Sequence, residues 1–260
     1  MSYLDDLYGL QGKVAVVVGG SGVLGGSMAL TLARAGAKVA ILYHNNKAGA
    51  LQQQKTIEEY GGAGLIVQAD TSEKQSVRAA NVAIIDAFSR VDILVNAPGI
   101  NSTTPVLDIG EDEWNRILDV NLKGVFLASQ VFGEQMIQQG HGGSIINISS
   151  ASSETPLSKV FTYSIAKSGL NSLTRFLARE WAPHNIRVNA VAPGFFPAEQ
   201  NRKILTKERR KSIFNHTPMN RYGEPEELSG AVVWLASGNA SSFVTGALIY
   251  VDGGFTAMTI

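Results

Sequence analysis

The chain contains no cysteine among its 260 residues. This absence excludes disulfides, thiolate metal sites and a cysteine nucleophile. No apolar run is long enough to span a membrane, and the polar, acidic start MSYLDDLYGLQGK is unlike a secretory signal. We therefore expect a soluble, cytoplasmic protein that makes no contact with a membrane.

An excess of charge of either sign is also missing. The chain has 22 Lys+Arg and 22 Asp+Glu residues, a formal net charge of zero, and no cluster of basic residues. A nucleic-acid groove therefore has no electrostatic support, and a small molecule is the expected partner. Hydrophobic residues make up 45% of the sequence, which is enough for a large buried core.

Seven short apolar runs alternate with helical patterns from one end of the chain to the other. The runs are apolar almost throughout, as expected of parallel strands that are covered on both faces. We predict an α/β fold with a single Rossmann-type, doubly wound, seven-stranded parallel sheet and helices on both faces. The predicted strands are 13–18, 38–43, 63–68, 91–96, 143–148, 186–192 and 247–252.

One segment interrupts this alternation. A long polar insertion, GFFPAEQNRKILTKERRKSIFNHTPMNRYG, follows the sixth predicted strand. No linker divides the chain, so we predict a single domain, 1–260. Ligands of such sheets lie beyond the carboxyl ends of the strands, and the insertion at about 195–222 is therefore predicted to be a substrate lid.

A glycine-rich turn, GGSGVLGG, follows the first strand and precedes a helix. Gly20, Gly22 and Gly25 satisfy G-x-G-x-x-G, in which bare backbone admits a diphosphate at a helix N-terminus. A tight turn that only packs the helix on the strand is the alternative, but the strand–helix context favours a dinucleotide. The expected contacts are Gly19, Ser21, Gly22, Val23 and Leu24.

The end of the second strand, LYHNNK, carries no carboxylate. An acidic residue there usually binds the ribose hydroxyls and would repel the 2′-phosphate of NADP(H). Imidazole and amide N–H groups can instead donate hydrogen bonds to that phosphate. We therefore favour NADP(H) over NAD(H), with Tyr43, His44 and Asn45 as contacts. His44 and Lys47 could equally be solvated residues at a helix start.

The stretch TYSIAKSG places Tyr163 and Lys167 one turn apart on one helix face. A phenol has a pKa of about 10 and is a poor acid or base at neutral pH. An ammonium about 4–5 Å away, at an effective dielectric near 20, favours the phenolate by roughly 3–4 kcal/mol, or about 2–3 pKa units. The pair is therefore either an activated proton donor or a surface pair without a role.

Two polar residues are candidates for the same site. Ser150 follows the fifth strand, where its hydroxyl could hold a substrate oxygen, although serines after strands are also common in loops. Asn121 lies within a predicted helix, where asparagine is unfavourable unless its amide has a partner. A buried amide that only ties the backbone together is the alternative for Asn121.

These motifs form an ordered set. The glycine turn, NAPG, DVNLKG, NISS, YSIAK and NAVAPG occur in one order along the chain. The chain thereby resembles the short-chain dehydrogenase/reductases of the classical type over essentially its whole length. The resemblance implies that Tyr163 is the general acid/base and that Lys167 lowers its pKa while holding the ribose. It also implies that Ser150 orients the carbonyl and that Asn121 anchors a water on the proton path.

The resemblance implies further cofactor contacts, and the sequence departs from the family pattern at one of them. Asp70 is expected at the adenine ring, and the turn that ends at Gly194 is expected at the nicotinamide. Pro98 departs from the family pattern and removes one backbone donor. The implied contacts are Asp70, Thr71, Asn96, Ala97, Pro98, Gly99, Tyr163, Lys167, Pro193, Gly194 and Phe196.

The substrate contacts are expected in and near the insertion. GGSGVLGG, TPLSK and PGFFPAEQNRKIL together look like the D-mannonate oxidoreductase (fructuronate reductase) branch. Arg202 offers a planar fork for a carboxylate, Lys159 offers a second charge, and Gln200 suits polyol hydroxyls. A solvated, charged surface helix is the alternative for this region, as it is for most runs like KERRK.

We expect an NAD(P)(H)-dependent oxidoreductase that moves hydride between the nicotinamide and the carbonyl or hydroxyl of a sugar acid or sugar. Ser150 and Tyr163 complete the predicted substrate contacts, and no metal is expected. A reductase of other small ketones, with an apolar pocket, is one alternative. A non-catalytic dinucleotide sensor is another. The resemblance also implies a homotetramer or homodimer.

Overall fold

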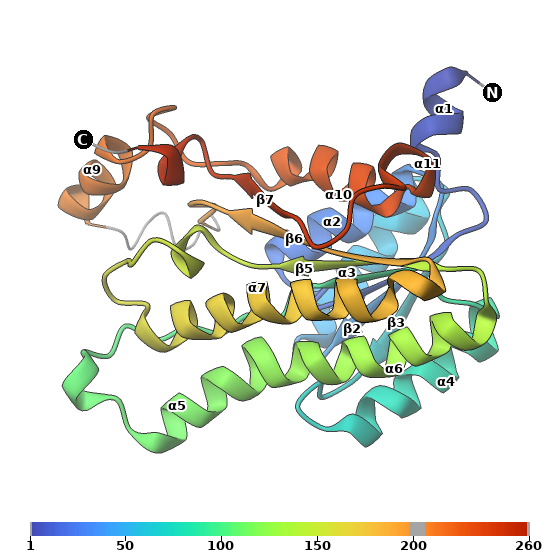
Figure 1. Cartoon of the computed structure of the whole chain (residues 1–260), viewed down its shortest axis with the longest axis horizontal. Coiled ribbons are helices and arrows are strands. Elements are labelled where there is room, and N and C mark those ends of the chain that lie inside the picture. The colour runs from blue at the N-terminus through green and yellow to red at the C-terminus, as the bar shows by residue number, and fades with distance from the viewer. Residues whose placement is uncertain (1, 198–205, 259–260) are drawn as a thin grey trace.

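The fold is built on one sheet of seven parallel strands in the order β3-β2-β1-β4-β5-β6-β7 (Figure 1). The computed structural model describes residues 2–197 and 206–258. The predicted seven-stranded parallel sheet is confirmed, and the predicted strand ends differ from the observed ones by no more than two residues. The strands are β1 (Val14–Val18), β2 (Lys38–Tyr43), β3 (Gly64–Gln68), β4 (Ile93–Asn96), β5 (Gly143–Ile148), β6 (Ile186–Pro193) and β7 (Leu248–Val251).

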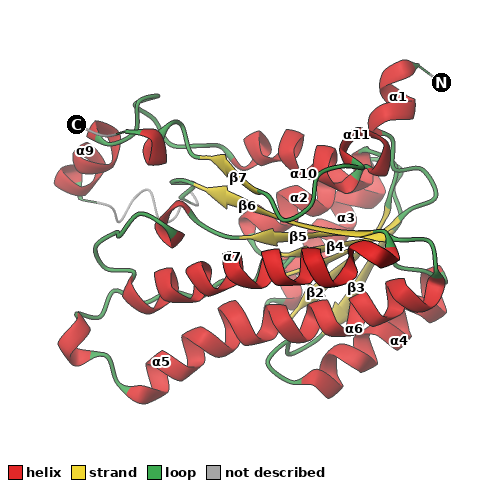
Figure 2. Cartoon of the chain, viewed as in Figure 1, coloured by secondary structure: helices red, strands yellow, loops and turns green. Residues whose placement is uncertain are grey.

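Helices cover both faces of the sheet, as Figure 2 shows by the red layers on either side of the yellow strands. The longest helix, α7 (Phe161–Trp181), carries the Tyr–Lys pair. One layer contains α2 (Val23–Arg34), α3 (Lys47–Glu59) and α10 (Ser229–Ala236), and the other contains α7 together with α4 (Lys74–Phe88) and α6 (Gly124–Gln139). The shorter helices are α1 (Tyr3–Tyr8), α5 (Glu111–Leu118), α9 (Lys207–Asn215) and α11 (Gly238–Ser241).

Strand β1 explains why the apolar runs in the sequence are continuous. Its five residues are all buried. Val14, Val16 and Val18 belong to the core on the side of α4 and α6. Ala15 and Val17 belong to the core on the side of α2 and α10. Because alternate side chains of a strand point to opposite faces, both faces need apolar residues and no polar position remains.

The strand order predicts where a ligand crevice forms at the carboxyl ends of the strands. Strand β1 pairs with β2 on one side and with β4 on the other. The strands after β1 are thus added first on one side of it, as β2 and β3, and then on the other side, from β4 onwards. In open parallel sheets a crevice forms beyond the carboxyl ends of the strands at such a point. The residues that follow Val18 and Asn96 therefore meet at this crevice.

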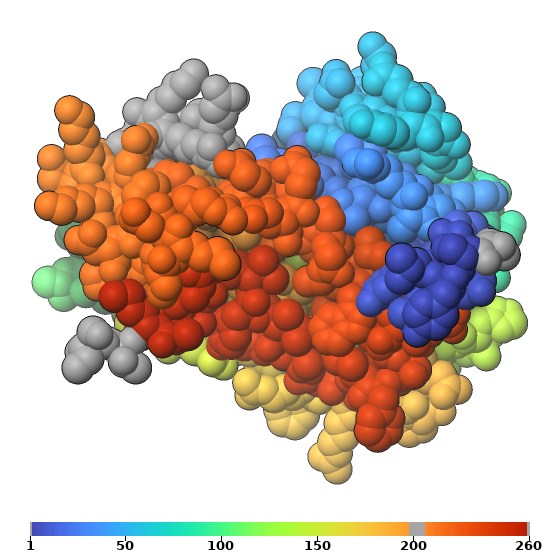
Figure 3. Space-filling view, turned by 90° about the horizontal axis from the view of Figure 1, so that it is seen from above, coloured from blue at the N-terminus to red at the C-terminus, as the bar shows by residue number. Residues whose placement is uncertain are grey.

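The N-terminal helix packs on the far end of the sequence. Ser237 Oγ donates a hydrogen bond of 2.6 Å to Leu7 O, and Asn239 Nδ2 donates one of 2.7 Å to Asp6 O. Figure 3 shows α1, in dark blue, lying against the orange and red C-terminal segments. No helix within residues 2–197 and 206–258 combines the length and the apolar character that crossing a membrane requires.

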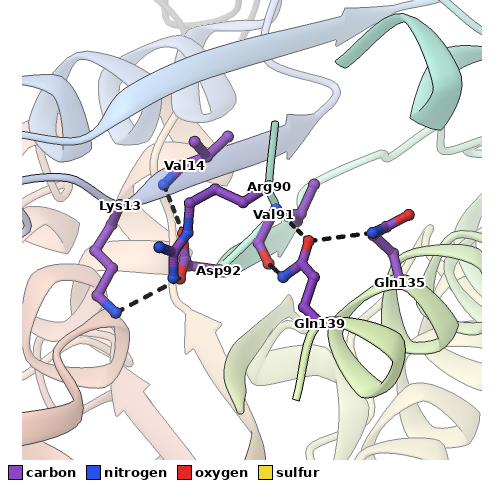
Figure 4. Close-up of polar contacts among 7 residues, drawn as sticks. All are labelled: Lys13, Val14, Arg90, Val91, Asp92, Gln135 and Gln139. Carbon is purple, nitrogen blue, oxygen red and sulfur yellow. Dashed lines mark hydrogen bonds and ion pairs between the residues drawn. The ribbon is translucent and has the colours of Figure 1, made fainter. Parts of the chain in front are cut away.

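A buried carboxylate joins the amino ends of the two central strands β1 and β4 (Figure 4). These ends lie on the opposite side of the sheet from the crevice at the carboxyl ends. Asp92 is 5% exposed and accepts hydrogen bonds from Arg90 Nε at 2.8 Å and Arg90 Nη2 at 2.5 Å. The same carboxylate accepts one from Val14 N at 3.0 Å and lies 3.5 Å from Lys13 Nζ. The side chain of Gln139 bonds both backbone groups of Val91 beside it.

Replacing Asp92 with alanine is expected to lower the free energy of unfolding by about 2–4 kcal/mol. The reason is that the substitution leaves Arg90 and the Val14 N–H without their buried acceptor. Half-exposed Lys13 adds little, because solvent screens its charge. Urea unfolding measures the change, with Asp86→Asn on the exposed side of α4 as the control. A loss below about 0.5 kcal/mol would contradict a structural role for Asp92.

Candidate active site

The glycine turn lies at the crevice and leaves backbone bare at the start of α2. Gly19 adopts φ +73°, and Gly22 caps α2 without a side-chain bond. A Cβ on Gly19 would lie 2.7 Å from Ala97 O, and one on Gly25 would overlap the Gly19 carbonyl. Glycine is therefore required at both positions, because the loop after β4 and the helix approach the turn closely.

The turn fits the diphosphate of a dinucleotide. The first N–H groups of a helix have no intrahelical acceptor, so the start of α2 presents donors and a positive dipole end. Gly22, Val23 and Leu24 line the cavity described below, as does Gly19. Ser21 lies in the same turn, and its carbonyl accepts a 3.0 Å hydrogen bond from Asn46 Nδ2.

The residues predicted at the adenosine end have different environments. Tyr43 is buried in the core, so its side chain faces α2 and α3 and not the surface. His44 and Asn45 are exposed beyond β2. His44 Nε2 lies 3.5 Å from Asp70 Oδ2, so these two predicted adenosine contacts lie side by side beyond β2 and β3. Thr71 packs closely against Gly124 at the start of α6.

Asp70 is engaged within its own loop. Its Oδ1 accepts hydrogen bonds from Ser72 N at 2.9 Å and Ser72 Oγ at 2.7 Å. The hydrogen bond from Ser72 is the largest influence on this carboxyl and holds its pKa below the usual value, while burial acts in the opposite direction. Asp70 is therefore an ionised acceptor at neutral pH.

The NAPG segment divides between the sheet and the cavity. Asn96 is fully buried and donates to Asn147 Oδ1 at 2.9 Å and to Ser129 Oγ at 3.2 Å. Its side chain thus ties β4 to β5 and α6, and it does not line the cavity. Ala97, Pro98 and Gly99 do line the cavity. A cofactor contact of the Asn96 side chain is therefore not supported, whereas those of Ala97, Pro98 and Gly99 stay predictions.

Asn121 lies in a π-helical turn, Asp119–Lys123, between α5 and α6. Its Nδ2 donates 2.8 Å hydrogen bonds to Ile100 O and Ile117 O, and its Oδ1 accepts one of 3.2 Å from Ile100 N. The amide therefore fixes the loop that follows Gly99. Both donors are used, while Oδ1 keeps one acceptor position. Single π-turns inside helices are frequent at functional sites.

Ser150 and Tyr163 meet at the carboxyl end of β5. Ser150 Oγ caps the short turn Ala151–Ser153 by accepting a 3.1 Å hydrogen bond from Ser152 N. The Ser150 side chain also lies beside the Tyr163 hydroxyl, close enough to affect its pKa. Tyr163 is partly buried and lines the cavity. Burial raises the pKa of Tyr163, and the neighbouring Ser150 side chain offsets this in part.

Lys167 is the deepest charged group of the site. It is 2% exposed, and its Nζ donates to Ile148 O at 2.8 Å and to Pro98 O at 3.4 Å. Its Nζ lies 5.5 Å from the centre of the Tyr163 ring. Burial lowers the pKa of Lys167 to about 7, because its only bonded acceptors among the described residues are neutral carbonyls.

The expected lowering of the Tyr163 pKa by Lys167 is not what the structure gives. Burial disfavours the charged form of each group. The phenol is therefore held neutral, and the ammonium is held close to its deprotonation point. At neutral pH the phenol therefore keeps its proton, and the pKa of the Lys167 ammonium lies close to the pH of the solution.

One cavity of about 870 Å³ joins these parts. It extends from the glycine turn, past the loops after β4 and β5, to Gly194 and Phe196 after β6 and to α9. Pro193 lies in β6 beside Val251 and does not line the cavity. Lys159 lines it and adopts φ +65°. Gln200 and Arg202 lie outside the described residues.

Sequence reasoning missed part of the cavity wall. Arg209 of α9 lines the cavity, although the KERRK run that contains it has the pattern of a solvated helix. Asn101 and Thr103, after β4, add polar groups to the same wall. In the sequence, a place for Arg209 in the cavity wall was indicated only by its position in the insertion, which follows the carboxyl end of the sixth strand.

Known proteins are similar to this chain in sequence and in architecture. A family model described as "Enoyl-(Acyl carrier protein) reductase" matches residues 21–256. A short chain dehydrogenase/reductase of Aspergillus oryzae is 42% identical over 97% of this chain and 98% of its own length. A 2-dehydro-3-deoxy-D-gluconate 5-dehydrogenase of Dickeya dadantii is 38% identical over 96% of this chain and 98% of its own length.

A solved structure extends the likeness to three dimensions. A gluconate 5-dehydrogenase from Burkholderia cenocepacia, in complex with NADP and tartrate, superposes with a TM-score of 0.93 at 34% identity, over 99% of this chain and 100% of that one. The family model, the relatives and the solved structure agree on one family and one fold. The chain belongs to the short-chain dehydrogenase/reductase family and is an NAD(P)-dependent oxidoreductase.

Proposed function

We propose that this chain is an NADP(H)-preferring reductase of the ketone of a sugar acid, of the mannonate/fructuronate kind. The charge of the cavity supports this proposal most. Among the described residues that line it, the charged ones are Lys159, Lys167 and Arg209, all of them cations. An anionic substrate gains charge-assisted hydrogen bonds from such a wall, whereas a neutral ketone does not.

The proposed roles follow from the geometry. The nicotinamide, when bound, supplies the hydride that the substrate carbon receives. Tyr163 gives its hydroxyl proton to the substrate oxygen, and Ser150 holds that oxygen from beside the phenol. The Lys167 ammonium stabilises the phenolate that forms. Asn121 keeps the loop after Gly99 in place and offers its remaining Oδ1 acceptor position to a relay water.

We further propose that the segment at about 195–222 is a lid over one domain, 1–260, and that the protein is a cytoplasmic homotetramer or homodimer. Helix α9 contributes Arg209 and Ile213 to the cavity wall, which supports the lid. Exposed apolar side chains on α6 and α7, such as Phe126 and Phe176, support self-association.

The substrate class is tested by a screen of hexuronates, ketogluconates and simple ketones with NADPH and with NADH. We expect kcat/KM for keto sugar acids to exceed that for neutral ketones by about 10- to 100-fold, which corresponds to one charge-assisted pair. We also expect NADPH to be the better cofactor, because the end of β2 carries His44 and no carboxylate.

Three outcomes would contradict parts of this proposal. Higher activity with neutral or apolar ketones would favour the general ketone reductase. Equal rates with both cofactors would refute the role given to the end of β2. Tight NADPH binding without turnover of any carbonyl would favour a dinucleotide sensor.

A further inference from the structure

Arg209 connects two segments that are far apart in the sequence. It lies in α9, within the proposed lid, and its partner Ser158 lies 51 positions earlier, in the loop before α7. Arg209 Nη1 donates a 2.8 Å hydrogen bond to Ser158 Oγ, and Nη2 donates one of 3.4 Å to Ser158 O. These two bonds hold the guanidinium at the wall of the cavity that also contains Tyr163.

The positive charge of Arg209 has no carboxylate partner among the described residues. Both of its acceptors there are neutral oxygens of Ser158. A guanidinium has five N–H donors in a planar fork, so donors remain after these two bonds. Its charge and its remaining donors are therefore available to a ligand that enters the cavity.

Lys159 adds a second cation at the same place. It follows Ser158 directly, lines the cavity and adopts a left-handed backbone at φ +65°. A residue with a side chain pays about 1–2 kcal/mol for this conformation, and such strained positions cluster at ligand sites. No aspartate or glutamate occurs among the described lining residues, so this end of the cavity is positive.

The cations lie apart from the predicted dinucleotide site. Ser158 and Lys159 come from the loop after β5, and Arg209 comes from the segment after β6. The glycine turn and the β2 end belong to strands on the other side of β4 in the sheet. The predicted diphosphate and ribose contacts therefore lie towards β1 and β2, so we assign Arg209 and Lys159 to the substrate and not to the cofactor.

We infer that Arg209, held by Ser158 and assisted by Lys159, binds the carboxylate of the substrate, while Ser150 and Tyr163 hold its ketone. This inference rests on the proposed function. A guanidinium fork binds a carboxylate through two parallel hydrogen bonds, which fixes the orientation of the acid as well as its affinity. Arg209 then selects acids over neutral sugars.

The experiment uses D-gluconate and its neutral analogue sorbitol, which replaces the carboxylate by a hydroxymethyl group. Isothermal titration measures the binding of each to the protein saturated with NADPH, where no turnover takes place. Arg209→Met is expected to weaken gluconate binding by about 10- to 100-fold and to change sorbitol binding by less than about twofold. Arg209→Lys should retain part of the preference.

Arg210→Met is the matched control, because Arg210 is the next residue of α9 and is exposed. It should leave both affinities unchanged. Thermal unfolding checks that the two methionine variants are equally stable. The KM for a keto sugar acid should rise in Arg209→Met by the same factor as the Kd for gluconate.

The possible failures are distinguishable. A wild type that prefers gluconate, with an Arg209→Met variant that keeps this preference, overturns the Arg209 assignment alone. An equal loss for gluconate and sorbitol also overturns it, since Arg209 would then only shape the lid. A wild type that neither prefers gluconate nor reduces keto sugar acids overturns the proposed function and the inference together.

Discussion

Replacing Tyr163 with phenylalanine is expected to lower kcat for ketone reduction by about 10³-fold, within the range of general acid catalysis. The substitution removes one oxygen and keeps the ring, so the packing of α7 against the cavity should not change. The substrate oxygen then lacks its proton donor, because the neighbouring Ser150 hydroxyl is a much weaker acid than a phenol. Steady-state kinetics with NADPH and a keto sugar acid measure the loss.

The binding of NADPH separates loss of chemistry from loss of structure. Its Kd should differ from that of the wild type by less than about threefold, since the glycine turn lies elsewhere in the cavity. Tyr60→Phe is the control for the substitution itself, because Tyr60 is 61% exposed at the end of α3. A Tyr163→Phe variant that keeps more than about a tenth of the wild-type kcat excludes the phenol as the proton donor.

The second large effect is expected for Lys167→Met. It should lower kcat by about 10²–10³-fold, as the loss of one preorganised charge at the reacting group does. The wild-type kcat for reduction should fall as the pH rises through about 7, because the buried Lys167 ammonium loses its proton there. The variant has no amine, so that step should be missing from its pH profile. An unchanged profile would refute the assignment of the step to Lys167.

Stability should change in the opposite direction from activity. Burial lowers the pKa of Lys167 from 10.5 to about 7. Between these values the unfolded state binds one more proton than the folded state, so the stability from this group rises as the pH rises from about 7 to 10.5. Below about pH 7 the full cost of the buried ammonium is present. Lys167→Met should therefore be as stable as the wild type or more stable at pH 6, and the difference should shrink as the pH rises.

An exposed lysine provides the reference for both measurements. Lys55→Met, at a side chain that is 70% exposed in α3, should change neither the pH profile of kcat nor the stability by a measurable amount. A large loss of stability in Lys167→Met at pH 6 would mean that the bonds to Ile148 O and Pro98 O outweigh the burial of the charge. Guanidinium unfolding at two pH values distinguishes these cases.

The sequence predicted the sheet and the glycine turn well because both depend on local rules. A strand buried on both faces must be apolar at every position, as β1 is, so the pattern is visible without any knowledge of its neighbours. A helix that packs against the turn at Gly25 allows no Cβ, so the glycine appears in the sequence. The one-turn spacing of Tyr163 and Lys167 is likewise a property of one helix.

The sequence was less informative wherever a side chain's role depends on a distant segment. Asn96 and Tyr43 stand at strand ends that face the cofactor crevice, yet their side chains point into the core. Nothing in their neighbourhood in the sequence distinguishes inward from outward at the last residue of a strand. The predicted direction of the Tyr163 pKa shift was also wrong. The observed direction depends on how much of the folded chain covers the phenol.

The sequence alone was therefore enough to predict the fold class, the glycine turn and the helix that carries Tyr163 and Lys167. The burial of the Lys167 ammonium against neutral carbonyls and the contact of Arg209 with the loop at Ser158 became visible in the folded chain alone. The physical reason is the range of the interactions involved. Periodicity and backbone conformation act over a few residues, whereas burial and charge depend on segments that meet only after folding.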